Sequence, residues 1–268
     1  MIKTIKIFGN HSEPSRYTVK LLRERLFNNN FEVIDDNNAD LIISVGGDGT
    51  FLQTLKETNF NPKPLYVGIL CGHLGFLQEI DRDEIDVFIE NIKSISYKIK
   101  KMSILNTIIE TKSCINQFYA LNETVIREKD LKALHINLMI NGSLVEKFFG
   151  DGIIVSTPIG STAYNLSADG SIVYPTLDVI QITHLAPINS SSYRSLSNSI
   201  VVPSKMIVCL IPAAGYSSDI LVCVDGINKV IPDVKKIEIL SNINHIKTLI
   251  FENYCFWTRI QKKFLYYP

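Results

Sequence analysis

The sequence has few of the residues that build disulfide scaffolds or metal clusters. Its five cysteines, at positions 71, 114, 209, 223 and 255, are an odd number in a chain of 268 residues, and no two form a CxxC pair. No spacing of cysteine and histidine closes a zinc site. Reduced thiols in a cytosol fit this pattern best, so we expect a cytoplasmic protein.

Net charge and long apolar runs are also missing. Lys and Arg number 27 and Asp and Glu number 27, which gives a formal charge of zero. The field that drives binding to nucleic acid is therefore absent. No stretch approaches the roughly 20 apolar residues of a membrane span, and the opening MIKTIKIF lacks the apolar run of a signal peptide. We expect neither nucleic acid nor membrane as a partner.

The first hundred residues alternate between strand and helix periodicity. Strands are predicted at 3–8, 41–45 and 65–70, and helices after Ser12 and over 85–92. The run 41–45 carries no charge, as expected of a central parallel strand that is covered on both faces. This pattern predicts a small, doubly wound α/β domain with a Rossmann-like sheet.

From about residue 97 the sequence changes to short β-branched runs separated by turn residues. Asn141-Gly142 and Asp225-Gly226 each lie between two such runs and predict hairpins. A β-rich, sandwich-like second domain follows. We therefore expect an α/β domain over 1–98, a β-rich domain over 99–250, and a C-terminal segment over 251–268 with helical spacing.

A glycine-rich loop directly follows the apolar strand at 41–45. It reads Gly46-Gly47-Asp48-Gly49-Thr50. Its glycines let a ligand reach main-chain N–H groups, and the next helix offers unpaired donors, so the loop suits a phosphate donor. Beside phosphate, a carboxylate would bind a metal or accept a proton from an attacking hydroxyl. The alternative is a tight turn whose Asp caps the helix.

Two further clusters carry polar groups. The run from Gly150 to Ala168 ends an apolar strand in hydroxyls, glycines and Tyr164, which suits a polar ligand; the alternative is a Ser/Thr-rich loop with caps. Asn122 and Glu123 lie in an otherwise apolar strand, where alternation alone would place them on a solvent-exposed face. Neither GxxxxGK[ST] nor GxGxxG occurs, which excludes the P-loop and the standard dinucleotide fingerprint.

Together these motifs resemble the NAD kinase family, which phosphorylates NAD to NADP. The resemblance rests on GGDGT at 46–50, GHLGF at 72–76, Asn122-Glu123, GDG at 150–152, the block at 156–164, and Asp225. It implies an N-terminal α/β domain, a β-rich C-terminal domain, NAD bound in the cleft between them, and a tail that returns to the first domain. It also implies ATP and NAD as substrates, a divalent cation, with Mg²⁺ expected, and a homodimer or homotetramer.

The resemblance also implies roles for individual residues. Asp48 is the expected proton acceptor for the 2′-hydroxyl of the adenosine ribose, and the phosphate-donor loop comprises Gly46, Gly47, Gly49 and Thr50. Residues expected to bind NAD are Asp48, Gly49, Phe76, Asn122, Glu123, Lys147, Asp151, Thr162, Ala163, Tyr164, Ser167, Ala186, Ile188 and Asp225.

The sequence departs from the family pattern at three places. Phe149 stands where a basic residue is common, Ile159 replaces a hydroxyl, and Asp169-Gly170-Ser171 replaces Gly-Gly-Pro. Two other function classes remain open. Diacylglycerol kinases and phosphofructokinases also carry GGDG[TS] after a strand, and a dinucleotide-binding sensor would keep the site without turnover.

Overall fold

The computed structural model describes residues 2–130, 132–189, 194–241, 245–251 and 255–265. The chain divides into two compact units, Met1–Lys101 with Ile246–Pro268, and Met102–His245. The boundaries predicted from the sequence lie at residues 98 and 250. Within the predicted C-terminal segment, 252–254 and 266–268 lie outside the described residues.

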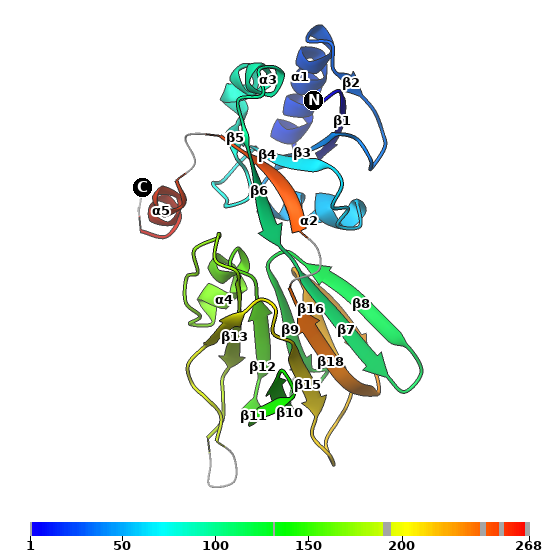
Figure 1. Ribbon diagram of the computed structural model, residues 1–268, viewed down its shortest axis with the longest axis vertical. Helices are drawn as coiled ribbons and strands as arrows, with labels where there is room; N and C mark the ends of the chain where they lie inside the picture. The colour runs from blue at the N-terminus through cyan, green and yellow to red at the C-terminus, as the bar shows by residue number, and fades with distance from the viewer. Residues whose placement is uncertain (1, 131, 190–193, 242–244, 252–254, 266–268) are drawn as a thin grey trace. The chain divides into compact units, whose positions relative to one another are not determined.

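The first unit contains a seven-stranded sheet in the order β2-β1-β3-β4-β19-β6, with β5 beside β4 (Figure 1). The pairs β1–β2, β1–β3, β3–β4, β4–β5 and β4–β19 are parallel. The strands are β1 (Thr4–Gly9), β2 (Glu32–Val33), β3 (Leu41–Gly46), β4 (Leu65–Leu70), β5 (Ile80–Asp81), β6 (Lys98–Ser103) and β19 (His245–Ile250).

The helices of this unit are α1 (Glu13–Asn28), α2 (Asp48–Glu57), η1 (Arg82–Glu84), α3 (Ile85–Lys93), α5 (Phe256–Ile260) and η3 (Gln261–Leu265). The last two follow each other directly and are together called the C-terminal helix. Ser12 caps α1 as its sequence predicts, accepting from the Ser15 amide at 3.4 Å. Helices α1 and α3 share one apolar core with the sheet, whereas Phe51 of α2 lies against Tyr66 with ring centroids 6.5 Å apart. The predicted doubly wound α/β class is confirmed.

The second unit contains two antiparallel sheets of six strands each, in the orders β11-β10-β15-β18-β7-β8 and β14-β13-β12-β9-β16-β17. One apolar core takes residues from both sheets, including Leu105, Leu138, Ile153 and Ile182, so the sandwich-like prediction is confirmed. The strands of the first sheet are β7 (Leu105–Thr111), β8 (Ile115–Ala120), β10 (Leu134–Ile140), β11 (Ser143–Gly150), β15 (Val208–Pro212) and β18 (Val234–Leu240). Those of the second are β9 (Glu123–Glu128), β12 (Gly152–Ser156), β13 (Val179–Leu185), β14 (Ile200–Pro203), β16 (Ile220–Val224) and β17 (Ile227–Ile231).

Turn chemistry follows the sequence closely. Asn141 and Gly142 have φ values of 48° and 81°, and Asp225 and Gly226 have 44° and 80°, as the two predicted hairpins require. In the segment 160–168, the non-helical backbone of Ala163 (φ −96°, ψ −133°) separates η2 (Gly160–Thr162) from α4 (Tyr164–Ser167). Among the described residues, none of the helices is both long and apolar enough for a membrane span.

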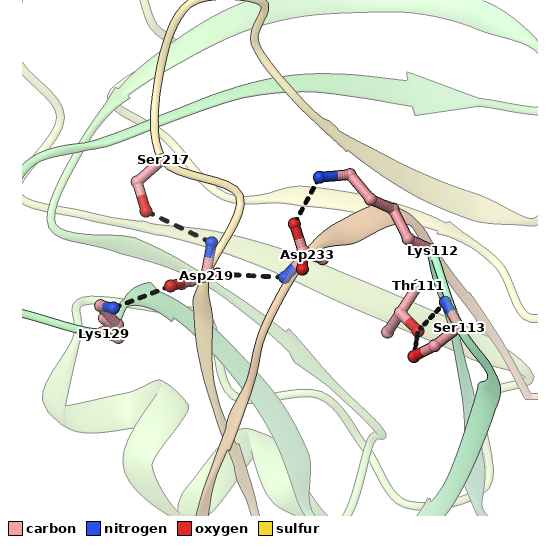
Figure 2. A network of polar contacts seen from close by, with 7 residues as sticks. All are labelled: Thr111, Lys112, Ser113, Lys129, Ser217, Asp219 and Asp233. Carbon is pink, nitrogen blue, oxygen red and sulfur yellow. Dashed lines mark hydrogen bonds and ion pairs between the residues drawn. The ribbon is translucent and has the colours of Figure 1, made fainter.

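Surface ion pairs join several turns of the sandwich (Figure 2). Lys112 Nζ lies 2.5 Å from Asp233 Oδ1, and Lys129 Nζ lies 2.7 Å from Asp219 Oδ2. Asp219 also accepts from the Asp233 amide at 3.0 Å, which links the two pairs. Because the four side chains are between 31% and 70% exposed, this network contributes little to stability and serves mainly to fix the turns.

Candidate functional site

Asp48 is held by the loop that follows β4. Its Oδ1 accepts from the amides of Phe76 and Leu77 at 3.0 Å each, and its Oδ2 accepts from the Phe76 amide at 3.0 Å. The N-cap of α2 is Gly47, which makes no side-chain cap. Asp48 is therefore directed at the neighbouring loop, and the interpretation of this motif as a helix cap is wrong.

Two glycines make room for this arrangement. A Cβ on Gly75 would lie 2.1 Å from Asp48 Oδ1, and one on Gly46 would lie 2.2 Å from the Thr50 hydroxyl oxygen. By contrast, apart from the adjoining residues and the backbone of α2 itself, no described atom lies within 4 Å of the Cβ position of Gly47 or Gly49. The backbone of the glycine loop is thus tightly packed at its start and open at Gly47 and Gly49.

The last described residues of the chain contact the same loop. The Phe76 ring stacks on Phe264 with centroids 5.9 Å apart, lies 6.0 Å from the Phe256 ring, and has Lys263 Nζ 4.9 Å from its centroid. Lys263 Nζ is also 3.5 Å from Asp48 Oδ2. Phe76, an NAD contact that the resemblance implies, is therefore packed against the C-terminal helix.

Arg259 anchors that helix to the loop. It donates to the carbonyl oxygens of Gly75, at 3.2 Å, and of Gln78, and it lies 3.7 Å from Glu79. Burial raises the pKa of Glu79 to about 7, although Arg259 and Lys100 act in the opposite direction. The loop that holds Asp48 is thus fixed by hydrogen bonds and ring contacts from the C-terminal helix.

In the second unit, Asp225 holds the strand that carries Asn122 and Glu123. Its carboxylate accepts from the amides of Leu121, Asn122 and Glu123 at 2.8, 2.9 and 3.2 Å. These bonds connect the tip of the β16–β17 hairpin to the start of β9. Asp225 therefore has a clear structural role, besides the NAD contact that the resemblance implies.

Glu123 is a buried acidic residue beside Asp225. The residue is 6% exposed, and its Oε2 finds no hydrogen-bond partner among the described atoms. Burial, and next the charge of Asp225, raise the pKa of Glu123 to about 8, against the effect of the Tyr164 amide. At neutral pH the group is mainly a neutral acid, which both donates and accepts hydrogen bonds.

This shift predicts a pH-dependent stability. A raised carboxyl pKa contributes stability that is fully present below the unfolded value of 4.5 and is lost as pH rises through about 8. Between pH 6 and pH 9, the free energy of unfolding of the parent should fall by about 2–3 kcal/mol more than that of the Glu123→Gln variant, as measured by urea denaturation. Glu24→Gln, at an exposed position of α1, is the control. Equal losses in parent and Glu123→Gln would contradict the assignment.

The hydroxyl-rich segment beside Glu123 contains two kinds of group. The hydroxyls of Thr157, Ser161 and Thr162 donate to nearby carbonyl oxygens at 2.6, 2.6 and 3.2 Å, which favours turn-building roles for those side chains. The Ser156 hydroxyl, whose residue pairs with Glu123 across β12 and β9, is fully buried and has no partner among the described atoms. The paired residues Glu123 and Ser156 thus each hold a buried oxygen without a hydrogen-bond partner among the described atoms.

Of the remaining predicted NAD contacts, some lie in adjoining segments of the second unit and others are exposed on β11 and α4. Asp151, Ala186 and Ile188 lie in adjoining segments, because the Asp151 amide donates to Leu185 at 2.9 Å and the Ile188 amide donates to Phe149 at 2.7 Å. Lys147 is exposed on β11, and Tyr164 and Ser167 are exposed on α4.

The three departures from the family pattern have structural explanations. Phe149 stacks on the His135 ring with centroids 4.3 Å apart, and Ile159 is buried at 9% exposure. Asp169 has a φ of 61°, a left-handed conformation that favours glycine and that Asp tolerates better than most residues. This position therefore keeps the backbone that the customary glycine would adopt.

The conformation of Asp169 predicts an order of stabilities. The free energy of unfolding of Asp169→Gly should exceed that of Asp169→Ala by about 1 kcal/mol, because alanine is strained in the left-handed conformation and glycine is not. Thermal or urea denaturation of the two variants measures the difference. An alanine variant at least as stable as the glycine variant would contradict this account.

Sequence reasoning missed three cationic residues near the predicted sites. Arg127 donates to the Tyr164 hydroxyl at 2.7 Å, while Arg259 and Lys263 contact the Asp48 loop. None of the three belongs to a motif, so no sequence signal singled them out. Among the described residues, no group of three or more His, Cys, Asp or Glu side chains is arranged to hold a metal ion.

Comparisons with known proteins agree with this geometry. The model of the ATP-NAD kinase N-terminal domain matches residues 9–97, and that of the ATP-NAD kinase C-terminal domain matches residues 121–249. The chain is 40% identical to the NAD kinase of Finegoldia magna, over 98% of both chains. It is 35% identical to the NAD kinase of Streptococcus gordonii, over 98% of this chain and 96% of that one.

Two solved structures share the fold. A yeast NADH kinase complexed with NADH matches with a TM-score of 0.86 and 20% identity, over 100% of this chain and 89% of that one. An NAD kinase from Archaeoglobus fulgidus in complex with ATP matches with a TM-score of 0.75 and 24% identity, over 98% of this chain and 97% of that one. With both domain models and a near-full-length relative at 40% identity, the chain belongs to the NAD kinase family.

Proposed function

We propose that this chain carries out the reaction of its family, the ATP-dependent phosphorylation of NAD, and that Asp48 is the residue that promotes it. The enzyme is a phosphotransferase with an alcohol group as acceptor. The observation that carries the assignment of Asp48 is its geometry: an ionisable carboxylate, 28% exposed, fixed by two backbone amides beside the open glycines of the donor loop.

The proposed step is a transfer to the 2′-hydroxyl of the adenosine ribose. The ribose oxygen forms a bond to the γ-phosphorus of ATP while its proton passes to the Asp48 carboxylate. The bond between the γ-phosphorus and the bridging oxygen breaks, and ADP leaves with that electron pair. A positioned base of this kind typically contributes about 10²- to 10⁴-fold to the rate, and the hydrogen bonds from Phe76 and Leu77 hold Asp48 in place for it.

Several groups are proposed as NAD contacts. Asn122 and Glu123 are proposed NAD contacts at the N-terminal end of β9, where Ser156 of β12 pairs with Glu123. Asp225 contributes by holding that strand through its three amide bonds. The other proposed NAD contacts are Gly49, Phe76, Lys147, Asp151, Thr162, Ala163, Tyr164, Ser167, Ala186 and Ile188.

A divalent cation, Mg²⁺ by expectation, accompanies ATP in this proposal. When bound it supplies charge neutralisation on the donor phosphates. The described residues fit a cation that is carried mainly by substrate phosphates, because they contain no acidic cage and Asp48 already accepts three hydrogen bonds. Excess EDTA should therefore abolish activity, and added Mg²⁺ should restore it.

The test of the proposed function is a substrate panel. The full chain is incubated with ATP and Mg²⁺ and, in separate reactions, with NAD, NADH, diacylglycerol or fructose 6-phosphate. We expect NADP from NAD. Product from diacylglycerol or fructose 6-phosphate alone would overturn the assignment in favour of another GGDG-type kinase, and tight NAD binding without any product would favour a sensor. A homodimer or homotetramer and a cytoplasmic location stay predictions, checked by light scattering and by fractionation.

A further inference from the structure

The C-terminal helix brings a positive charge to the proposed base. Lys263 Nζ lies 3.5 Å from Asp48 Oδ2, and the two side chains are 34% and 28% exposed. Lys263 comes from η3, a π-helical turn, a conformation that is frequent at functional sites. The backbone of this turn is held in place because Arg259 is anchored to the loop and Phe264 stacks on Phe76. The Lys263 side chain itself lies over the Phe76 ring.

Stability alone gives little reason for this ion pair. Both groups are partly exposed, and pairs of this kind contribute little to folding. Asp48 is also already satisfied by the amides of Phe76 and Leu77. A lysine beside Asp48 is better explained by a contact with the bound substrate.

Phosphoryl transfer brings like charges together at this point. A ribose hydroxyl bonded to Asp48 must also lie within about 3–3.5 Å of the γ-phosphorus to react. The phosphoryl oxygens then come close to the carboxylate and repel it. Lysine carries its compact charge on a flexible stem of four carbons, so Lys263 can turn from Asp48 to a phosphoryl oxygen without movement of the helix.

We infer that Lys263 is a phosphate-binding residue of this enzyme: it pairs with Asp48 in the free protein and contacts the transferred phosphoryl group of ATP in the complex. Lys263 transfers no atom in this step. The ribose proton still passes to Asp48, and ADP still leaves with the electron pair of the broken bond. This inference rests on the proposed function, because it requires ATP to react beside Asp48.

The test compares Lys263→Met, Lys263→Arg and the matched control Lys262→Met, which removes the adjacent exposed lysine of the same helical turn. Lys263→Met should lower kcat about 10²-fold, as the loss of a transition-state charge contact does, and should raise the KM for ATP with little change in the KM for NAD. Lys263→Arg should recover at least a tenth of the parent kcat. Lys262→Met should behave as the parent.

A binding measurement separates this role from a structural one. Calorimetric titration of ATP with Mg²⁺ should show several-fold weaker affinity for Lys263→Met than for the parent, with an unchanged urea midpoint. An unchanged kcat and ATP affinity would overturn the inference, and so would a raised kcat, which would mark the pair as inhibitory. An equal loss in the methionine and arginine variants, with lowered stability, would also overturn it. If the parent itself makes no NADP, the proposed function fails, whatever the lysine variants show.

Discussion

The Asp48→Asn variant should lose NADP formation by about 10²- to 10⁴-fold while it keeps its fold. Asparagine has nearly the same shape, and its side-chain oxygen can still accept from the amides of Phe76 and Leu77. It cannot take the proton of the ribose hydroxyl at any working pH, because an amide is not a base in this range. The loss should therefore fall on kcat, measured by the rate of NADP formation at saturating ATP and NAD.

Two controls make this result specific. Asp83→Asn removes a carboxylate from an exposed position of the same unit and should keep the parent rate. The urea midpoint of Asp48→Asn should stay close to that of the parent, since most of its hydrogen bonds remain. An Asp48→Asn enzyme with more than a tenth of the parent kcat would rule out proton transfer to this residue as the main contribution.

The Gly75→Ala variant should lose activity by at least about 10²-fold through Asp48, without any direct contact to substrate. The added Cβ would lie 2.1 Å from Asp48 Oδ1 and 2.6 Å from Gln78 Oε1, distances that real Cβ atoms do not show. The carboxylate must move, and a displacement of about 1 Å at a catalytic group is enough for a loss of this size. Steady-state kinetics of the variant measure the effect.

A double-mutant cycle identifies the cause. If the alanine acts by displacing the carboxylate, Gly75→Ala should cause little further loss of activity in an Asp48→Ala background, where no carboxylate remains. It should also cost less free energy of unfolding there than in the parent, because the closest contact is gone. Full additivity of both effects would contradict the account and would assign the loss to the loop itself.

The local elements of the fold were predictable because their signals are local. The apolar run at 41–45 and the glycine loop after it correspond to β3 and the start of α2, and the Asn-Gly and Asp-Gly turns form the two hairpins. The place of β19 was not predictable in this way. It pairs with β4 in the first unit, although it follows the strands of the second unit in sequence. Strand periodicity says which residues face a core and nothing about a distant partner.

The candidate site was likewise predictable only in part. The motif around Asp48 marks a carboxylate beside a phosphate loop, but only the fold shows that Gly75, Phe76 and Leu77 hold it. Lys263 had no sequence signal, since a lysine in an amphipathic tail is usually a solvent-exposed residue. Likewise, burial beside Asp225, which no motif reports, makes Glu123 a neutral acid near pH 7.

The most direct measurement of the central claim is a crystal structure of the Asp48→Asn protein with NAD and ATP bound. The account predicts that the 2′-oxygen of the adenosine ribose lies within about 3.2 Å of the side chain at position 48, with the γ-phosphorus on the opposite side of that oxygen. A ribose bound elsewhere, with the side chain at position 48 turned only to the amides of Phe76 and Leu77, would contradict it.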